Sequence, residues 1–445
     1  MIKTKLKIFS ILVISLVFIY AFSASYTSDS IDNISYVIAL AIDLGEDGKN
    51  LQVTFEFMDT SSFASEQSSE TSKAIIDTVN ATSINSAINL LNAYIGKEVN
   101  LSHCKVVVFS DTIASQGLYE EVTELMNNIQ VRPSTNIIIC KGNAMEYIQK
   151  STSELEKILT KYYDIFPNSS EYTGYTSNIM IGEFYNYLTT KECGNLAILG
   201  GLNPEISPPE SSQGGSSSGG SAKDDSSSGE SGTSKDSSSQ SQENDKPKNI
   251  PLSEMISGNA PILGERGTEN IGLAVLKDGK YIGDLTAADT LCHTLISGEV
   301  NSFLLTIDNT EVYEKYIDIA LYENTSPKIT VDISDDIPTI HVNIDLIGRI
   351  TGIKDGINYS DEHSSLDLDK ISNSVNNTLK EYLSKYLNKT STEFKCDIDY
   401  FYNFAKRNFL TLQDWKNYDW SSKYEKSNFD ISINARIYYS LLNSD

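Results

Sequence analysis

Histidine and cysteine are the residue types in this sequence that could bind a metal or act as nucleophiles, and both are scarce. The four histidines are His103, His293, His341 and His363, and the five cysteines are Cys104, Cys140, Cys193, Cys292 and Cys396. Zinc sites take His and Cys ligands at short, regular spacing, and a disulfide framework takes an even set of paired cysteines. Neither pattern is present, so we predict no metal site and interpret each histidine as structural or solvated.

Three further patterns resemble catalytic or binding motifs only in part. Residues 215–219 read Gly-Ser-Ser-Ser-Gly, but a nucleophile elbow needs a strand before it and a helix after it. The Gly-Lys pairs, such as Gly96-Lys97, lack the second glycine and the Ser or Thr of a phosphate-binding loop. Residues 43–48 begin like a calcium loop, but Thr54 stands where that loop needs a bidentate Glu. We therefore predict no catalytic, cofactor-binding or metal-binding residues.

Aromatic side chains near the C-terminus are the remaining candidates for a functional surface. They are Phe401, Phe404, Trp415 and Trp420. Tyr and Trp are enriched where proteins bind one another, so this stretch is our candidate contact with a partner. The competing interpretation is that these rings fill a core, since aromatic residues supply much of the buried area of a fold.

The N-terminus carries an export signal. Lys3, Lys5 and Lys7 precede an apolar run over 8–22, which is the pattern of a signal peptide or a signal anchor. Small residues around Ser23 would permit cleavage, whereas an uncleaved run would hold the chain at a membrane. Both alternatives stay open for residues 1–25, and we expect the rest of the chain to be exported.

The charge of the chain excludes some partners. Its formal net charge is -25 at pH 7. Such a surface repels nucleic acid backbones, so we expect no nucleic acid partner. Anionic lipid headgroups would also repel it, and attachment to a membrane therefore needs an apolar anchor.

A low-complexity tract divides the sequence. Between Ser207 and Lys248 the only hydrophobic residue is Ala222, and the rest is mainly Ser, Gly and charged residues. Such a tract cannot bury enough apolar area to offset the entropy lost on ordering. We expect residues 204–250 to form a disordered linker, with a reach of roughly 35 Å.

Before this linker, residues 30–203 are expected to form an N-terminal α+β domain. Continuous apolar strands alternate with helical patterns, which is typical of a sheet covered by helices. Asp47-Gly48 lies between the first two strands and predicts a hairpin turn. The expected strands are 36–43, 51–58, 104–109 and 136–140, and the expected helices are 75–95, 118–129, 145–148 and 155–163.

After the linker, residues 251–308 are expected to form a middle domain and residues 309–445 a C-terminal α+β domain. In the middle domain a second Asp-Gly turn joins two strands, and Thr286 is expected to cap a helix with Asp289 three residues on. In the C-terminal domain, alternating strands and two helices predict an antiparallel sheet with helices on one face. The predicted fold class is α+β, with three mixed domains, each a sheet packed with helices, and a disordered Ser/Gly-rich insertion.

Four segments in order resemble the Ger(x)C family, the C subunits of bacterial spore germinant receptors. They are Ala39-Leu40-Ala41-Ile42-Asp43 with the turn after it, Leu101-Ser102-His103-Cys104-Lys105 with the strand after it, Gly272-Leu273-Ala274-Val275 with its hairpin, and a C-terminal region that contains Asp397, Trp415, Trp420 and Arg436. The resemblance covers nearly the whole chain. It implies three α+β domains and no known catalytic residues.

The resemblance also implies a place and partners. It implies a protein on the outer face of the spore inner membrane that works with two integral membrane receptor subunits. Family members normally have a lipid-modified Cys after the apolar run, but the first Cys here is Cys104. Attachment is therefore expected through an N-terminal helix or through the partner subunits. The alternative function is an extracytoplasmic solute-binding protein; a cell-wall hydrolase would need a carboxylate pair or zinc site that the sequence does not display.

Overall fold

A computed structural model describes residues 7, 9, 11–18, 33–58, 75–151, 159–203, 250–262, 266–308, 316–353 and 368–438. Most of the expected N-terminal segment, and residues 204–249 of the expected linker, lie outside these ranges. Residues 11–18 are helical, with exposed side chains. Among the described residues, no helix has the length and apolar character that crossing a membrane requires.

The larger of two sheets has nine strands in the described part of the chain, in the order β3-β2-β1-β5-β6-β7-β8-β9, with β4 beside β1. The bounds are β1 Ile34–Leu44, β2 Leu51–Phe57, β3 Ile75–Ala81, β4 Glu98–Asn100, β5 Val106–Ser110, β6 Asn136–Cys140, β7 Asn195–Leu202, β8 Thr268–Lys277 and β9 Lys280–Leu285. Strands β1, β5, β6 and β7 are parallel, and antiparallel strands flank them. All residues of β5 and β6 are buried, as their continuous apolar sequences predict.

Helices cover this sheet. They are α2 Ile84–Ile95, α3 Asp111–Gln116, α4 Tyr119–Asn127, α5 Ala144–Lys150, α6 Leu159–Ile165, the short turn η3 Phe166–Ser169, α7 Ser170–Thr173 and α8 Ile181–Leu188. Helices α3 and α5 pack on β1 and β5, and α8 packs on β6 and β7. The helix predicted over 75–95 is wrong in its first part, because residues 75–81 form β3. That stretch is rich in β-branched residues, which favour a strand, and the helix begins only after its N-cap, Ser83.

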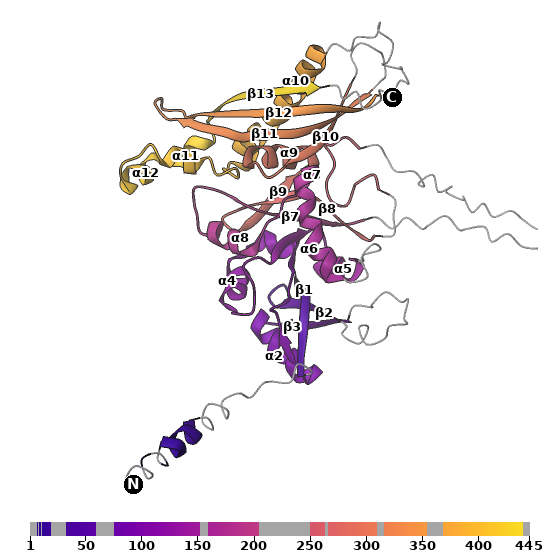
Figure 1. The fold of residues 1–445 in the computed structure, drawn as a ribbon, viewed down its shortest axis with the longest axis vertical. Coiled ribbons are helices and arrows are strands. Elements are labelled where there is room, and N and C mark those ends of the chain that lie inside the picture. Colours follow the sequence, from indigo (N-terminus) through magenta and orange to yellow (C-terminus); the bar gives the residue numbers. More distant parts are fainter. Residues whose placement is uncertain are drawn as a thin grey trace, which may run out of the picture.

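The smaller sheet is formed by β10 Ser302–Asp308, β11 Tyr316–Asp332, β12 Thr339–Ile353 and β13 Asn428–Tyr438, in that order. Figure 1 shows it at the opposite end of the molecule from α2. Its helices are α9 Ala287–Ser297, α10 Leu368–Asn388, the wide turn η4 Lys389–Phe394, α11 Tyr402–Lys406, α12 Leu412–Tyr418 and α13 Trp420–Tyr424. The prediction of a fully antiparallel sheet is wrong for the last strand, since β13 runs parallel to β12. The connection between them contains helices, as a parallel crossover requires.

The α+β prediction is confirmed, in the form of two sheets packed with helices. The range 251–308, expected to be a middle domain, contributes β8 and β9 to the larger sheet and β10 to the smaller one. The division into three domains stays a prediction. Buried apolar side chains from both sheets belong to one connected core, so the two sheets are packed together rather than only linked.

Candidate functional site

Three of the four aromatic side chains expected to touch a partner lie in the core. Phe401, Trp415 and Trp420 are 0%, 2% and 2% exposed, and Phe404 is half-buried. The rings of Trp415 and Trp420 pack with centroids 6.1 Å apart. The buried three therefore hold the local fold, and a partner could contact only their exposed neighbours.

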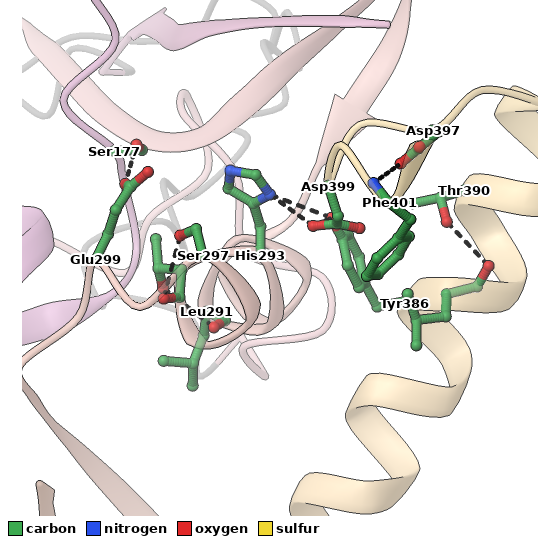
Figure 2. Close-up of polar contacts among 12 residues, drawn as sticks. Ser177, Leu291, His293, Ser297, Glu299, Tyr386, Thr390, Asp397, Asp399 and Phe401 are labelled. Atoms are coloured by element: carbon green, nitrogen blue, oxygen red, sulfur yellow. Dashed lines mark hydrogen bonds and ion pairs between the residues drawn. The ribbon is translucent and has the colours of Figure 1, made fainter. Parts of the chain in front are cut away.

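Asp397 fixes the position of this aromatic cluster. Its carboxylate accepts hydrogen bonds from the backbone N–H groups of Phe401 (3.1 Å) and Tyr402 (2.7 Å) and from Nε1 of Trp420 (3.0 Å). Figure 2 shows the contact with Phe401. Burial raises the pKa of Asp397 to about 7, against the opposing effect of the hydrogen bonds that it accepts. We call this set of contacts the Asp397 clamp.

A second buried polar group joins α9 to α10 and the chain after η4. Nδ1 of His293 lies 2.8 Å from Oδ1 of Asp399, and the hydroxyl of Tyr386 donates to the same oxygen at 2.9 Å. Figure 2 shows the three side chains converging from different segments. Burial opposes the charged form of His293, but the bond to Asp399 and nearby carboxylates outweigh it and raise the His293 pKa. A buried charge pair of this kind needs close geometry to persist.

The polar contacts continue toward the larger sheet. Glu299 accepts a hydrogen bond from the hydroxyl of Ser177, in the segment before α8 (Figure 2). Between them and His293 lies a cavity of about 30 Å³, also lined by Glu183 and Tyr400. This is about the volume of one water molecule in the liquid. The arrangement suits a structural joint between the two sheets, and its space is far below the roughly 300 Å³ of an ordinary ligand pocket.

A larger cavity of about 220 Å³ lies at the amino ends of β5 and β6. Lys105 and Asp164 form an ion pair of 2.8 Å at its rim, where Arg132 is also exposed. The lining residues are Ser102, Cys104, Lys105, Arg132, Ser134, Asn136, Asp164, Pro167, Asn178 and Met180. Its polar lining and small size limit any ligand to a small polar solute.

The segment that contains the buried aromatic cluster also carries exposed side chains. We call residues 401–424 the aromatic arm. Leu410 is 102% exposed and Leu412 58% exposed, although Trp415 beside them is buried. Exposed Lys406 and Arg407 precede the two leucines. In Figure 1, α11 and α12 extend from one side of the molecule below the smaller sheet.

The cysteine thiols are poorly placed to act as nucleophiles or metal ligands, because they are buried. All five cysteines are free and buried. Burial raises the thiol pKa of Cys104 and of Cys396 to about 12. Since the thiolate is the nucleophile and the metal ligand, these side chains are inert near neutral pH. Within the described ranges, His, Cys, Asp and Glu form no group of three that could hold a metal ion.

The sequence did not indicate the His293–Asp399 pair, because 106 positions separate the two residues. The only available signal was an isolated histidine among the apolar residues Leu291, Cys292, Leu295 and Ile296 of a predicted helix. The other described histidines do not join it: His341 lies 2.8 Å from exposed Asp430, and the ring of His103 packs against Tyr36. His363 lies outside the described residues.

Comparison with known proteins gives two consecutive family matches. Residues 28–200 match the model for the spore germination protein N-terminal domain, and residues 271–440 match the model described as "Spore germination B3/ GerAC like, C-terminal". A solved structure, described as "Crystal Structure of the GerBC protein", is similar with a TM-score of 0.49 and 14% identity, and the match covers 89% of this chain and 96% of that one. No curated protein sequence matches the chain.

Proposed function

Because the chain belongs to the Ger(x)C family of spore germination proteins, we propose that it is a non-enzymatic subunit of a nutrient germinant receptor, which binds two integral membrane subunits. In this proposal the folded part lies on the outer face of the spore inner membrane. The apolar N-terminal segment or the partner subunits hold it there, and its role is to scaffold the receptor.

The observation that carries the scaffold proposal is the joint between the two sheets. The His293–Asp399–Tyr386 group and the Asp397 clamp are buried and paired, and the adjacent cavity holds about 30 Å³. Helix α9, which His293 holds to α10, packs on strands of both sheets, and Glu299 accepts from Ser177 before α8, so these contacts hold the two sheets together. The Asp397 clamp stabilises the segment after η4. The inert cysteines support a role without covalent chemistry.

The aromatic arm is the proposed contact with the membrane subunits. Its buried rings preorganise the segment, and a preorganised surface loses little entropy on binding. It presents Leu410 and Leu412 beside Lys406 and Arg407. A complementary partner surface is therefore an apolar pocket with an acidic rim.

Co-purification of the receptor from spores tests this proposal. The double variant Leu410→Asp, Leu412→Asp places charges in the contact and is expected to lose most of the bound membrane subunits. A matched control is Leu304→Asp, on β10, where the side chain is 48% exposed but lies outside the arm. The melting temperature of the Leu410→Asp, Leu412→Asp double variant should stay near that of the parent, because both leucines are exposed. Full assembly of the folded double variant would remove the arm from the proposal.

The alternative function, solute binding, is favoured by the cavity of about 220 Å³. Asp164 and Arg132 carry opposite charges at its rim, as recognition of a zwitterionic solute would need. Ligand pockets usually have volumes of about 300–1,000 Å³, so this one would take only a small molecule. Calorimetry of the full chain with amino acids and simple sugars separates the two functions. Tight binding that Arg132→Ala abolishes would replace the scaffold proposal.

A further inference from the structure

The cavity of about 30 Å³ between the two sheets is lined by two carboxylates. They belong to Glu183, in α8, and Glu299, two residues after α9. Burial and the nearby charge of Glu299 raise the pKa of Glu183, so the two carboxylates lie close enough to repel each other. Within the described ranges, no Lys or Arg forms an ion pair with either of them. Their negative charges are therefore available to a ligand.

An unpartnered buried amide also lines this cavity. Asn195 is 4% exposed, and its Nδ2 donates to the backbone carbonyl of Phe184 at 3.1 Å. This bond fixes the orientation of the amide, because a carbonyl oxygen can only accept. The Oδ1 atom of Asn195 is buried and has no hydrogen-bond partner in the described part of the chain. Since a buried acceptor without a donor is destabilising, a ligand that donates here would be favoured.

One side of the His293 ring faces the same space. The ring contacts Asp399 and Tyr386 through Nδ1, at 2.8 and 3.5 Å. Figure 2 shows the other ring nitrogen, Nε2, on the side of Glu299 and Ser177, and no described residue pairs with it. His293 is 4% exposed and lines the cavity. In neutral His293, Nδ1 keeps its proton for Asp399 and Nε2 becomes an acceptor.

The chemistry of this lining selects one class of ligand. Two carboxylates, an amide oxygen and a neutral imidazole nitrogen are all hydrogen-bond acceptors. An ammonium group is positively charged, carries only N–H donors and is about the size of a water molecule, which suits a cavity of about 30 Å³. A divalent metal ion fits less well, because no three His, Cys, Asp or Glu side chains in the described ranges could hold one.

We propose that this cavity binds an ammonium group, either the ammonium ion or the end of a small amine, in exchange for the proton on Nε2 of His293. That proton passes to solvent, and Nε2 then accepts an N–H of the ligand while Nδ1–H still donates to Asp399. One positive charge replaces another, so the local charge is unchanged.

The bound group would strengthen the joint between the sheets. Glu183 lies on α8, which packs on β6 and β7 of the larger sheet, whereas α9, which carries His293, packs on strands of both sheets. A ligand that bonds to both side chains therefore adds a link between α8 and α9. This role goes beyond the proposed scaffold function and does not depend on the membrane subunits.

The exchange also predicts how affinity changes with pH. The groups that face His293 are Asp399, Tyr386, Glu299 and Glu183. Burial opposes the charged form of His293, but the three carboxylates outweigh it and raise the His293 pKa. Below that pKa a proton must leave before the ligand binds, so the apparent affinity should rise about tenfold for each pH unit and level off above it. Ionisation of Glu183, whose pKa is also raised, acts in the same direction.

Melting temperatures of the full chain test the ligand class. The salts compared at equal ionic strength and pH 8 are the chlorides of ammonium, methylammonium, potassium and tetramethylammonium. We expect the ammonium salt to raise the melting temperature by a few degrees, because a ligand that binds only the folded state stabilises it. Tetramethylammonium has no N–H donor and should give no rise. A rise with methylammonium as well would extend the ligand to organic amines, and a rise with ammonium alone would limit it to the ion.

Calorimetry tests the exchange. Ammonium chloride is titrated into the full chain near pH 6 in buffers of different ionisation enthalpy. We expect about one proton to be released for each ammonium group bound, since His293 is protonated there. Binding without proton release, or an equal rise of melting temperature in potassium chloride, would overturn the inference.

A double variant locates the site. Glu183→Gln with Glu299→Gln removes both charges and should abolish the rise in melting temperature. Both side chains are exposed, and glutamine can still accept from Ser177, so the variant should fold. Glu120→Gln, at an exposed position of α4, is the matched control and should keep the full rise. A rise that persists in the double variant would contradict the inference. Should that variant not fold, Glu183→Gln alone is expected to lower the affinity at least tenfold, and an unchanged affinity would exclude this site.

Discussion

At the scale of single residues, two buried carboxylates hold backbone segments in place. Asp43 illustrates this role in the larger sheet: its two oxygens accept from the backbone N–H groups of Ala144 (2.8 Å) and Met145 (2.9 Å) and so cap α5. Asp397 does the same for the turn that begins α11 and adds the indole of Trp420. Asp43 joins segments 101 positions apart in the sequence, whereas Asp397 acts within the segment 397–420.

Removal of the Asp397 side chain should destabilise the smaller sheet and its helices. Asp397→Ala leaves three donors without their acceptor in a buried position, and each unsatisfied group costs about 1–3 kcal/mol. We expect a loss of about 3 kcal/mol or more in the free energy of unfolding, measured by urea denaturation. Asp335→Ala, at an exposed position, is the control and should change stability little. Similar midpoints for the two variants would show that the clamp has little energetic role.

Buried acids should make the protein less stable as pH rises toward neutrality. Glu56 is 1% exposed, and the hydroxyl of Tyr163 donates to it at 3.0 Å. Burial raises its pKa to about 8, and burial raises that of Asp397 to about 7. The folded state therefore holds protons that the unfolded state releases at lower pH. His293, whose pKa is also raised, acts in the same direction.

The raised pKa values of Glu56 and Asp397 determine how the free energy of unfolding changes with pH. Stability contributed by the two acids is fully present below their unfolded pKa values near 4 and is lost as pH rises through about 7 for Asp397 and about 8 for Glu56. We expect the free energy of unfolding to fall between pH 5 and pH 8. Glu56→Gln cannot ionise, so its stability curve should be flatter over that range. A parent curve that rises with pH would contradict these assignments.

At the scale of elements, the best-predicted features are those with local signals. Thr286 and Asp289 form the expected capping box at the start of α9, with bonds of 3.2 and 3.1 Å. Both Asp-Gly turns also join adjacent antiparallel strands, as expected. Such signals depend on neighbouring residues only, and so they are visible in the sequence.

Loss of the cap on α9 gives a test at this scale. Thr286→Ala removes the acceptor for the backbone N–H of Asp289 and should lower stability by about 1 kcal/mol. Thr286→Ser keeps the hydroxyl and should retain most of that stability. Thermal unfolding of the two variants checks the difference, and equal melting temperatures would show that the capping box does not stabilise α9.

Features that depend on distant residues were not predictable. The parallel pairing of β12 and β13 requires knowledge of where the chain crosses the sheet, and alternation of side chains does not carry that information. For Trp415 and Trp420 the sequence left two interpretations, a partner contact or a core, and the choice depends on which helices pack over them. The partner of His293 is likewise set by tertiary contacts. The sequence thus indicated most elements and the α+β class, but not the joint between the sheets.

At the scale of the whole molecule, the long insertion joins two strands that are already neighbours. Strands β7 and β8 pair in an antiparallel manner, with Leu202 opposite Thr268. Leu202 and Thr268 therefore lie side by side, at the two ends of the segment that contains the insertion.

Deletion of residues 214–241 should leave the fold intact. The deletion removes 28 of the 46 residues of 204–249 and leaves 18 (46 − 28), which can span roughly 60 Å when extended. A shorter loop also costs slightly less entropy to close. We expect an unchanged or slightly higher melting temperature, measured by circular dichroism. A shorter deletion in the same tract, 214–227, serves as the control, and its melting temperature should also be unchanged. A marked loss of melting temperature in both would show that the tract contributes to packing.

Because β7 pairs with β8, non-covalent contacts hold together the two regions that the insertion links covalently. The two family-matched regions meet within one sheet and one apolar core. A protease that cuts the chain between them would produce two polypeptides that remain bound to each other. In the same way, a gene divided within the insertion would encode two halves that complement each other by completing a shared sheet.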